Sequence, residues 1–274
     1  MQGFPSSLVL VGAGKMGAAM LEGWLRAGLS PQAVTVLDPA PSDGVQALSR
    51  QHGFALNATH APERAQAAEV VVLAIKPQML DQAAASFQSW VGPNTLLVSV
   101  LAGKTVANLH ARLPQTERVV RAMPNLPASV MRGMTGCYAA RAVTYAQKGM
   151  AQRLLEAVGA VEWVADEALI DSVTAVSGSG PAYVFLLVEC LAQAGIEQGL
   201  PADVAAKLAR TTIEGAGELL RQSDLSPATL RQNVTSPAGT TAAALEVLMA
   251  ADGLAPLMQR AVRAARLRAE ALSG

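Results

Sequence analysis

The 274-residue sequence is poor in cysteine, histidine and aromatic residues, and it carries no net charge. Cys137 and Cys190 are too few for a disulfide framework and lack the spacing of a zinc or redox motif, so both are predicted to be buried thiols. Twenty-one basic residues balance twenty-one acidic ones, and nothing in this balance attracts nucleic acid or an anionic membrane. We therefore expect a small-molecule partner, no nucleic acid, no membrane and no metal site.

Long apolar segments are scarce as well. Residues 1–7 lack the basic and then apolar pattern of a secretory signal, so a cytoplasmic location is expected. The most apolar helix candidate, Pro181–Ala194, is interrupted by Glu189 and Gln193 and falls short of the roughly 20 residues that span a bilayer. It is predicted to lie in a core or an interface.

Short β-type runs alternate with helix-type stretches from Leu8 to about Val164, which is typical of a parallel sheet covered by helices. The runs are Leu8–Val11, Val34–Leu37, Val70–Ile75, Thr95–Val100 and Arg118–Ala122, with weaker ones at Thr135–Ala140 and Ala160–Val164. After about Asp166 these runs disappear and long segments rich in Ala and Leu follow. The predicted fold class is α/β: a Rossmann-type doubly wound sheet in residues 1–165, followed by an all-helical C-terminal domain in 166–274.

The segment Gly12-Ala13-Gly14-Lys15-Met16-Gly17 follows the first predicted strand and opens the first helix. The first glycine permits the tight turn, the second lets a pyrophosphate approach the backbone, and the third lets helix and strand pack closely. Free N–H groups at the helix start would hold the diphosphate. A nicotinamide dinucleotide site is predicted here, and a glycine-rich turn that binds no nucleotide is the alternative.

Two further residues lie at predicted strand ends. Asp38 ends the second strand, where a carboxylate accepts a hydrogen bond from a ribose 2′-hydroxyl and repels a 2′-phosphate; this favours NADH over NADPH. As an alternative, Asp38 starts a turn with Pro39. Lys76 faces the cofactor, or it is a solvated lysine before a helix that begins at Pro77.

Two loop-like segments precede helices later in the chain, Ser177–Gly180 and Thr235–Thr241. Each offers backbone N–H groups and hydroxyls at a helix start, an arrangement that holds a small carboxylate. Two ordinary helix caps are the alternative interpretation.

Taken together, the motifs resemble the pyrroline-5-carboxylate reductase family from Leu8 to about Arg268. The resemblance rests on five segments: the glycine-rich turn, Ala74-Ile75-Lys76-Pro77-Gln78, Met123-Pro124-Asn125, Ser177-Gly178-Ser179-Gly180-Pro181-Ala182-Tyr183, and Val234 through Thr241. It implies that NADPH or NADH reduces the cyclic imine 1-pyrroline-5-carboxylate to L-proline, the final step of proline biosynthesis. It also implies a homodimer built by the helical domain, and a decameric ring of such dimers.

The resemblance further implies roles for individual residues. Thr241 is the expected catalytic residue, because its hydroxyl would hydrogen-bond the ring nitrogen. The expected substrate-binding residues are Glu167, Ser236, Gly239, Thr240 and Thr241. The expected cofactor-binding residues are Val11, Gly12, Ala13, Gly14, Lys15, Met16, Gly17, Asp38, Ala74, Ile75, Lys76, Pro77, Val100, Leu101, Ala102 and Asn233.

The sequence departs from the family pattern at Ala238, where the family usually has glycine, which narrows the available backbone conformations. No acid–base pair is needed, because a protonated imine is already electrophilic; His52, His60 and His110 accordingly fall outside the motifs. An enzyme that resembles the β-hydroxyacid dehydrogenases would need a lysine on the first long interdomain helix to handle an alcohol proton. The stretch Pro181–Ala194 contains no lysine, so this alternative is disfavoured. A nucleotide-sensing regulator without turnover is the remaining alternative.

Overall fold

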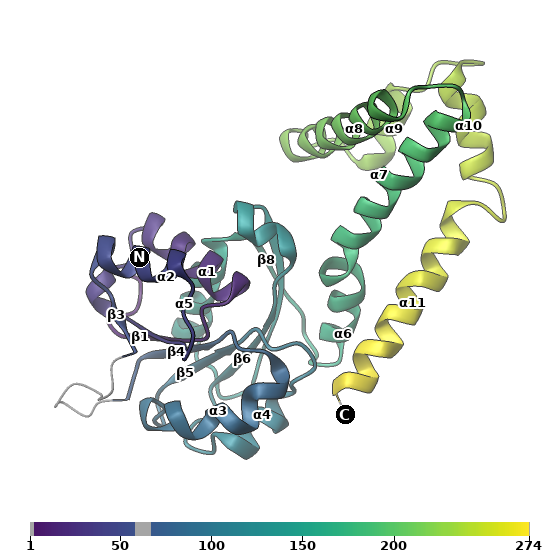
Figure 1. The fold of residues 1–274 in the computed structure, drawn as a ribbon. Helices are drawn as coiled ribbons and strands as arrows, with labels where there is room; N and C mark the ends of the chain where they lie inside the picture. Colours follow the sequence, from purple (N-terminus) through teal and green to yellow (C-terminus); the bar gives the residue numbers. More distant parts are fainter. Residues whose placement is uncertain (1–2, 58–66, 274) are drawn as a thin grey trace. The chain divides into compact units, whose positions relative to one another are not determined.

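The computed structural model describes residues 3–57 and 67–273, which form two compact units. Unit 1 holds the chain up to Gly178 together with the end of the last helix from Arg266 onward; unit 2 is Ser179–Ala265 (Figure 1). Helices replace strands close to the predicted boundary at 165/166. Unit 1 extends further because α6 (Leu169–Val173) packs on β7 (Gly133–Ala139): a Cβ built on Gly136 would lie 2.4 Å from the side chain of Val173.

Unit 1 is built on a sheet of eight strands among the described residues, in the order β3-β2-β1-β4-β5-β6-β7-β8. The first six follow the strand order of a Rossmann fold. The strands are β1 (Leu8–Val11), β2 (Val34–Leu37), β3 (Ala55–Leu56), β4 (Val70–Leu73), β5 (Leu96–Ser99), β6 (Val119–Met123), β7 (Gly133–Ala139) and β8 (Gly159–Trp163). Sequence analysis missed only the two-residue β3.

One strand pair departs from the predicted parallel arrangement. β7 runs antiparallel to β6, with Met123 opposite Gly136 and Val120 opposite Ala139. Only a short 3₁₀ turn, Leu126–Val130, lies between the two strands. A parallel neighbour would need a crossover of a dozen or more residues, so the short connection dictates the antiparallel pairing.

Helices cover both faces of this sheet. α1 (Lys15–Arg26), α2 (Asp43–His52) and α5 (Tyr145–Glu156) lie on one face, and α3 (Leu80–Phe87) and α4 (Val106–Arg112) lie on the other (Figure 1). β1 shows why: Leu8 and Leu10 belong to the first core, while Val9 and Val11 belong to the second. All four are buried, as expected for a strand covered on both sides.

A close contact between α1 and α5 fixes the helix that follows the glycine-rich turn. The indole Nε1 of Trp24 donates a hydrogen bond of 2.7 Å to the carbonyl oxygen of Leu154, and the Trp24 side chain is fully buried. A Cβ on Gly23 would lie 2.7 Å from the carbonyl oxygen of Ala157, so glycine allows the approach. This packing holds the C-terminal end of α1 against the end of α5.

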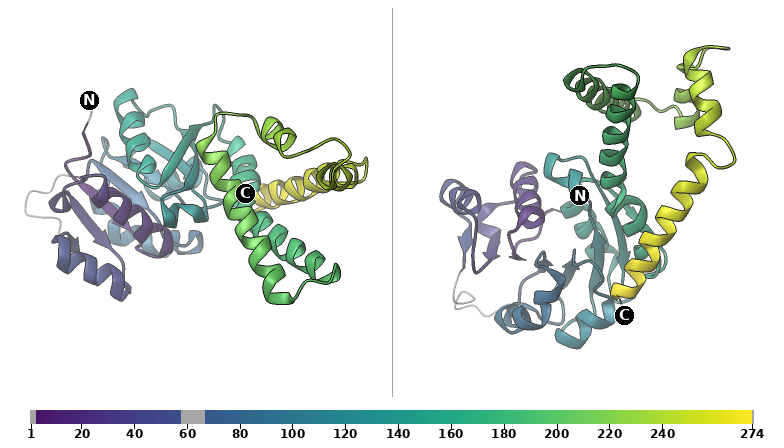
Figure 2. Two further views of the ribbon diagram at one scale, coloured as in Figure 1. Left: turned by 90° about the horizontal axis from the view of Figure 1, so that it is seen from above. Right: turned by 45° about the vertical axis from the view of Figure 1, so that its right-hand side comes forward.

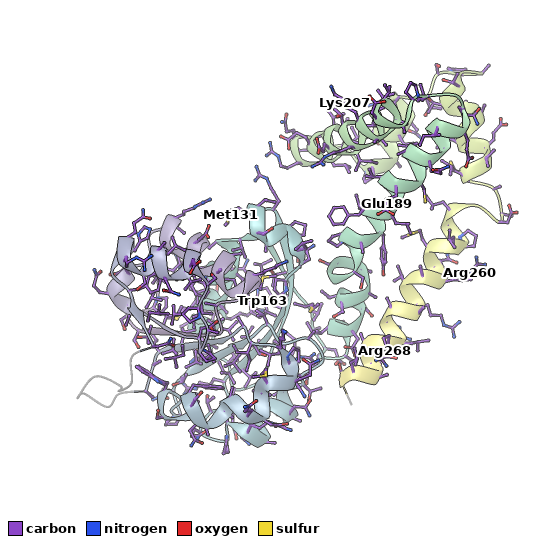
Figure 3. The ribbon with its side chains drawn as sticks, viewed as in Figure 1. Met131, Trp163, Glu189, Lys207, Arg260 and Arg268 are labelled. Carbon is purple, nitrogen blue, oxygen red and sulfur yellow. The ribbon has the colours of Figure 1, made fainter. Side chains whose placement is uncertain are left out.

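Unit 2 is helical throughout its described length. Its helices are α7 (Gly180–Glu197), α8 (Ala202–Gln222), α9 (Pro227–Asn233), α10 (Thr240–Leu248) and the first part of α11 (Leu254–Ser273). α7 and α8 form a hairpin (Figure 2), in which Ala205 and Ala209 are buried. Glu189 and Lys207 project from these two helices (Figure 3).

Large apolar side chains of unit 2 are left exposed. Phe185 and Leu186 on α7 are 54% and 57% exposed, and Leu219 on α8 is 61% exposed. α7 has no buried residue at all. Many large apolar side chains left exposed on one helical unit are typical of a surface that packs against another molecule.

By length and composition, one described helical stretch, Leu169–Glu197, is long and apolar enough to cross a membrane. It is longer than the predicted Pro181–Ala194 segment because α6 and a π-helical turn, Thr174–Gly178, lead into α7. A helix that packs against a second subunit has the same apolar character. The absence of a membrane partner therefore stays a prediction.

The two cysteines differ in exposure. Cys137 on β7 is buried, and burial raises the pKa of its thiol to about 12. Cys190 is exposed, so the prediction of two buried thiols is wrong for this residue. It lies on α7, none of whose residues is buried although the helix packs on α8.

Candidate functional site: a dinucleotide pocket and a helix-start loop

The glycine-rich turn is shaped by close backbone contacts. Gly12 has a φ of 90°, and its N–H donates to the carbonyl oxygen of Leu37 at 2.8 Å. A Cβ at Gly12 would lie 2.9 Å from the carbonyl oxygen of Ala74, and a Cβ at Gly17 would lie 2.1 Å from the carbonyl oxygen of Gly12. These two positions therefore require glycine for packing, as the motif predicts.

Gly14 has a different role. It is exposed, and a Cβ built on it would meet nothing within 4 Å. Gly14 is the N-cap of α1, and no side chain caps this helix. The space above Gly14 and the unpaired N–H groups of the first turn form a cradle that fits the diphosphate of a dinucleotide.

Asp38 connects the end of β2 to this turn. Its Oδ2 accepts a hydrogen bond from the backbone N–H of Ala13 at 2.7 Å, and its Oδ1 accepts one from Ala40 N–H at 2.9 Å. The side chain of Asn57 pairs with the backbone of Asp38, donating to its carbonyl oxygen at 2.7 Å and accepting from its N–H at 2.8 Å. Asp38 is thus held in place from both sides, and its carboxylate also stabilises the turn.

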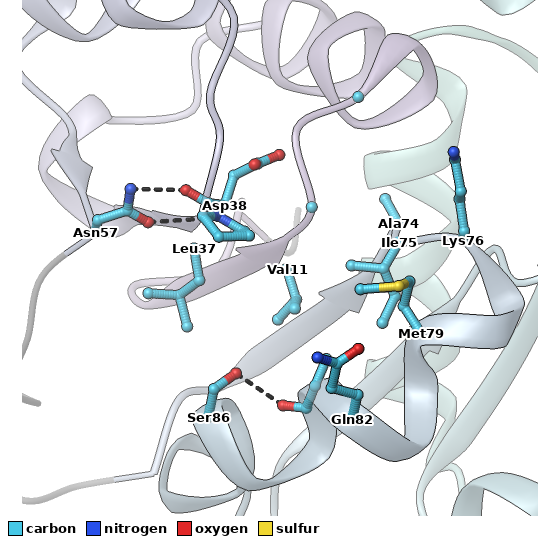
Figure 4. Close-up of a pocket in the computed structure, with 14 residues that line it drawn as sticks. Val11, Leu37, Asp38, Asn57, Ala74, Ile75, Lys76, Met79, Gln82 and Ser86 are labelled. Atoms are coloured by element: carbon cyan, nitrogen blue, oxygen red, sulfur yellow. Dashed lines mark hydrogen bonds between the residues drawn. The ribbon is translucent and has the colours of Figure 1, made fainter.

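A pocket of about 630 Å³ opens beside the turn (Figure 4). Seven of the predicted cofactor-binding residues line it: Val11, Gly12, Gly14, Asp38, Ala74, Ile75 and Lys76. Seven other lining residues were not predicted: Leu37, Pro39, Asn57, Met79, Gln82, Ala83 and Ser86. Met79, Gln82, Ala83 and Ser86 are spaced three or four residues apart, as on one face of α3 and its N-cap. This spacing can be read from the sequence.

The other predicted cofactor residues lie outside this pocket lining. Lys15, Met16 and Gly17 form the first turn of α1, Ala13 holds Asp38, and Pro77 begins a 3₁₀ turn. Val100, Leu101 and Ala102 follow β5, and the N–H of Val100 donates to the carbonyl oxygen of Leu73 at 3.0 Å. Asn233 is the last residue of α9 in unit 2. Their cofactor contacts stay predictions.

Glu167 is part of a partly buried ion pair in unit 1. Its Oε1 accepts hydrogen bonds from the Nη1 of Arg121 at 2.8 Å and from the backbone N–H of Val106 at 2.7 Å. Arg121 lies within β6 and is 4% exposed, so Glu167 provides the compensating charge. The carboxylate therefore has a structural role beside the predicted one at the substrate.

The second predicted site, Ser236–Thr241, forms the loop before α10 and the first two residues of this helix in unit 2. The N–H of Gly239 donates to the carbonyl oxygen of Ser236 at 3.1 Å, and Gly239 is the N-cap without a side-chain hydrogen bond. Thr240 and Thr241 form the first turn of α10, where backbone N–H groups have no intrahelical acceptor. Such a helix start can hold a carboxylate.

Ala238, where the family pattern has glycine, adopts a φ of 56°. This left-handed conformation is strained for a residue with a Cβ, by roughly 1–2 kcal/mol. The loop shape is therefore compatible with alanine at the expense of local strain.

The predicted glycine-rich turn at Ser177–Gly180 is instead helical. The π-helical turn Thr174–Gly178 and the start of α7 contain it. Within unit 1, the amide of Asn125 donates to both the carbonyl oxygen and the Oγ of Ser177 at 3.2 Å, and its Oδ1 accepts from Met134 N–H at 2.8 Å. Asn125 thus ties this turn to the end of β6 and the start of β7.

In the described part of the chain, neither candidate site contains a histidine or a cluster of side chains that could hold a metal ion. His110 is exposed and its Nδ1 lies 3.4 Å from the carbonyl oxygen of Thr116; His52 ends α2; and His60 lies outside the described residues. Among residues 3–57 and 67–273, no three His, Cys, Asp or Glu side chains are grouped to hold a metal ion.

Comparisons with known proteins agree with this geometry. A family model described as pyrroline-5-carboxylate reductase dimerisation matches residues 167–272, and one described as NADP oxidoreductase coenzyme F420-dependent matches residues 7–103. A pyrroline-5-carboxylate reductase of Pseudomonas aeruginosa is 39% identical over 267 residues, 97% of this chain and 96% of the relative. One of Synechocystis sp. is 43% identical over 211 residues, 77% of each chain.

Solved structures give the same result. The pyrroline-5-carboxylate reductase of Coxiella burnetii matches with a TM-score of 0.89 and 34% identity over 98% of this chain and 99% of the other. That of Plasmodium falciparum, with NADP bound, matches with a TM-score of 0.79 and 26% identity over 99% and 100% of the two chains. With this similarity over nearly its whole length, the chain belongs to the pyrroline-5-carboxylate reductase family.

Proposed function

We propose that this protein reduces 1-pyrroline-5-carboxylate to L-proline with NADPH or NADH, the final step of proline biosynthesis. The observation that supports this most directly is the pocket beside Gly12 and Gly14, whose shape fits a dinucleotide, in a chain of this family. When bound, the reduced nicotinamide supplies a hydride to the imine carbon.

The chemistry asks the protein mainly for alignment. A protonated cyclic imine is electrophilic, so the imine carbon must be held at roughly 3–3.5 Å from the hydride donor. The pair of electrons of the C=N bond then moves to nitrogen, and a secondary amine results. We assign the orientation of the ring nitrogen to the hydroxyl of Thr241.

The substrate carboxylate is assigned to the start of α10. Ser236, Gly239 and Thr240 surround backbone N–H groups that no side chain caps, and the helix dipole favours an anion there. Glu167 stays a proposed substrate neighbour, with the ion pair to Arg121 as a second role. The proposed cofactor contacts are completed by Ala13, Lys15, Met16, Gly17, Pro77, Val100–Ala102 and Asn233.

The cofactor preference is proposed to lean towards NADH. Asp38 lines the pocket and brings a carboxylate to it, where a 2′-phosphate would be repelled. A relative in this family was solved with NADP bound. We therefore assign the proposed preference for NADH to the side chain at position 38, and a substitution there should change the preference.

The protein is proposed to act as a homodimer through residues 166–274. The exposed apolar faces of α7 and α8 favour this assembly, and the match to a dimerisation model over residues 167–272 supports it. A decameric ring of dimers, a cytoplasmic location and the absence of membrane and nucleic-acid partners belong to the same proposal.

A steady-state assay tests the proposal. The purified protein should oxidise NADH and NADPH only when 1-pyrroline-5-carboxylate is present, and chromatography should detect L-proline in equal amount. Dinucleotide binding without proline formation would favour a regulator, and oxidation of a β-hydroxyacid by the oxidised cofactor would favour a dehydrogenase. Light scattering should report a dimer or a multiple of one.

A further inference from the structure

A second pocket lies at the far edge of the sheet in unit 1. It has a volume of about 320 Å³. Its lining comes from α5 and the end of β8: Tyr145, Lys148, Gly149, Gln152, Arg153 and Trp163. The α5 residues recur every three or four positions, so they form one stripe along the helix. We call this set the basic pocket.

The basic pocket contains two cationic side chains without an acidic partner. Among the described residues, neither Lys148 nor Arg153 takes part in an ion pair. Nε of Arg153 is buried and has no hydrogen-bond acceptor. The guanidinium of Arg153 is therefore not neutralised by any described residue, and an anion in the pocket would supply the missing counter-charge.

Two carboxylates lie near these residues in sequence, and neither forms an ion pair with Lys148 or Arg153. Glu156, one helical turn after Gln152, accepts a hydrogen bond from the Gln152 amide at 2.6 Å. Glu162 precedes Trp163 on β8, and successive residues of a strand point to opposite faces. The exposure along β8 alternates accordingly, with Glu162 exposed and Trp163 half-buried.

Trp163 forms a fixed aromatic wall of the pocket. Its indole Nε1 donates to the side-chain oxygen of Gln152, and the Nζ of Lys148 lies 4.5 Å from the centre of its ring. The cation–π contact holds the lysine ammonium at the pocket. Arginine adds a planar fork that matches carboxylate and phosphate oxygens.

The basic pocket is separate from the dinucleotide pocket. The two linings share no residue. The dinucleotide pocket lies at β1, β2 and β4, whereas β8 is the last strand at the other side of the sheet, with β5, β6 and β7 between.

We propose that the basic pocket binds a small oxyanion, a phosphate or carboxylate group borne by a metabolite whose apolar part packs beside Trp163. Lys148 and Arg153 supply the charge and Gln152 a polar contact. Occupancy gives both cationic side chains a counter-charge that no ion pair among the described residues supplies.

Calorimetric titration of the protein saturated with NADP⁺ tests this proposal. Inorganic phosphate and malonate, each at ionic strength matched with chloride, are the probes, and their relative affinities distinguish a phosphate from a carboxylate ligand. Saturable binding is expected for at least one probe, together with a saturable change in tryptophan fluorescence that Trp163→Phe abolishes. Heat and fluorescence changes no larger than those of added chloride would overturn the proposal.

Matched variants locate the binding. The double variant Lys148→Gln/Arg153→Gln should bind the better probe at least tenfold more weakly, while its kcat for the proposed reaction stays unchanged, because neither residue belongs to the proposed active site. Arg141→Gln, which removes an exposed arginine outside the pocket, should bind as the unchanged protein does. Equal affinity in the double variant, or equal weakening in both, would assign the anion to another site.

Discussion

Oδ2 of Asp38 lies 2.7 Å from the backbone nitrogen of Ala13 and accepts its hydrogen bond. The residue expected to read the ribose is therefore also the residue that holds the glycine-rich turn against β2. Two effects are combined in one carboxylate: a hydrogen bond to the turn and a negative charge at the pocket.

Two substitutions separate these effects. Asp38→Asn keeps an oxygen that can accept from Ala13 and removes the charge, so the ratio of kcat/KM for NADPH to that for NADH should rise about tenfold, or ~1.4 kcal/mol. Asp38→Ala also removes the acceptor and should raise KM for both dinucleotides. Steady-state kinetics with both cofactors measures this, and an unchanged ratio in Asp38→Asn would show that the carboxylate does not face the ribose.

Thr241 gives a second prediction. Thr241→Ala should lower kcat about tenfold or more, because the loss of one hydrogen bond costs roughly 1–1.5 kcal/mol, while the Kd for NADPH stays close to its original value. Thr241→Ser retains the hydroxyl and should keep most of the activity. If the alanine variant turned over normally, the orienting role would have to be abandoned.

The strained Ala238 gives a third prediction. Ala238→Gly should raise the free energy of unfolding by about 0.5–1 kcal/mol, because glycine adopts a φ of 56° without a Cβ penalty while losing more entropy on folding. Gly239→Ala is the contrasting variant, since its Cβ would lie 2.3 Å from the Oγ of Ser236; it should destabilise the protein. Urea unfolding at one protein concentration compares them, because assembly also contributes to stability. A destabilising Ala238→Gly would contradict the strain.

Glu167→Gln distinguishes the two roles of this residue. The variant keeps an acceptor for Val106 N–H but leaves the buried guanidinium of Arg121 without its counter-ion, so we expect a loss of roughly 1–3 kcal/mol in stability. A role at the substrate would in addition raise KM for the pyrroline. Lower stability with unchanged KM would leave only the structural role.

Cys137 gives a pH-dependent prediction. Burial raises its pKa from 9.0 to about 12, so the folded state favours the neutral thiol. Its contribution is fully present below pH 9 and declines as the pH rises towards 12, since only the unfolded chain ionises readily there. Cys137→Ala should therefore flatten the loss of stability between pH 9 and 11, and a thiol reagent at pH 8 should modify Cys137 only after unfolding. Rapid labelling of native Cys137 would contradict this.

Sequence reasoning located the parts of the fold whose residues interact locally. β1 and β2 were predicted with their observed bounds, and the glycine-rich turn was predicted with its packing roles, because strand, turn and helix signals are adjacent in the chain. The hydrogen bond from Ala13 to Asp38 joins residues that folding brings together, and no local pattern records it. The antiparallel β7 follows from the short connection after β6, whose length the predicted strand bounds overstated.

The same limit explains the mistakes in the candidate sites. The Gly and Ser residues at 177–180 suggest a turn, yet the hydrogen bonds from Asn125 hold this segment in a π-helical form. Cys190 has an apolar neighbourhood in sequence, but α7 packs on α8 without burying any of its own residues, and Cys190 stays exposed. Asn57 follows the short β3 and adopts a left-handed φ of 53°. It lines the pocket because its side chain pairs with the backbone of Asp38, and the sequence gives no sign of this contact.

The boundary between the two units falls within α11, and this affects the order in which unit 1 can fold during synthesis. Residues from Arg266 onward belong to unit 1, although all of unit 2 precedes them in sequence, and a Cβ on Gly103 would lie 2.8 Å from the carbonyl oxygen of Leu272. A nascent chain emerges from the ribosome in order, and domains that are contiguous in sequence can fold as they emerge. Here the nucleotide-binding half must wait for the last helix to be translated before its packing is complete.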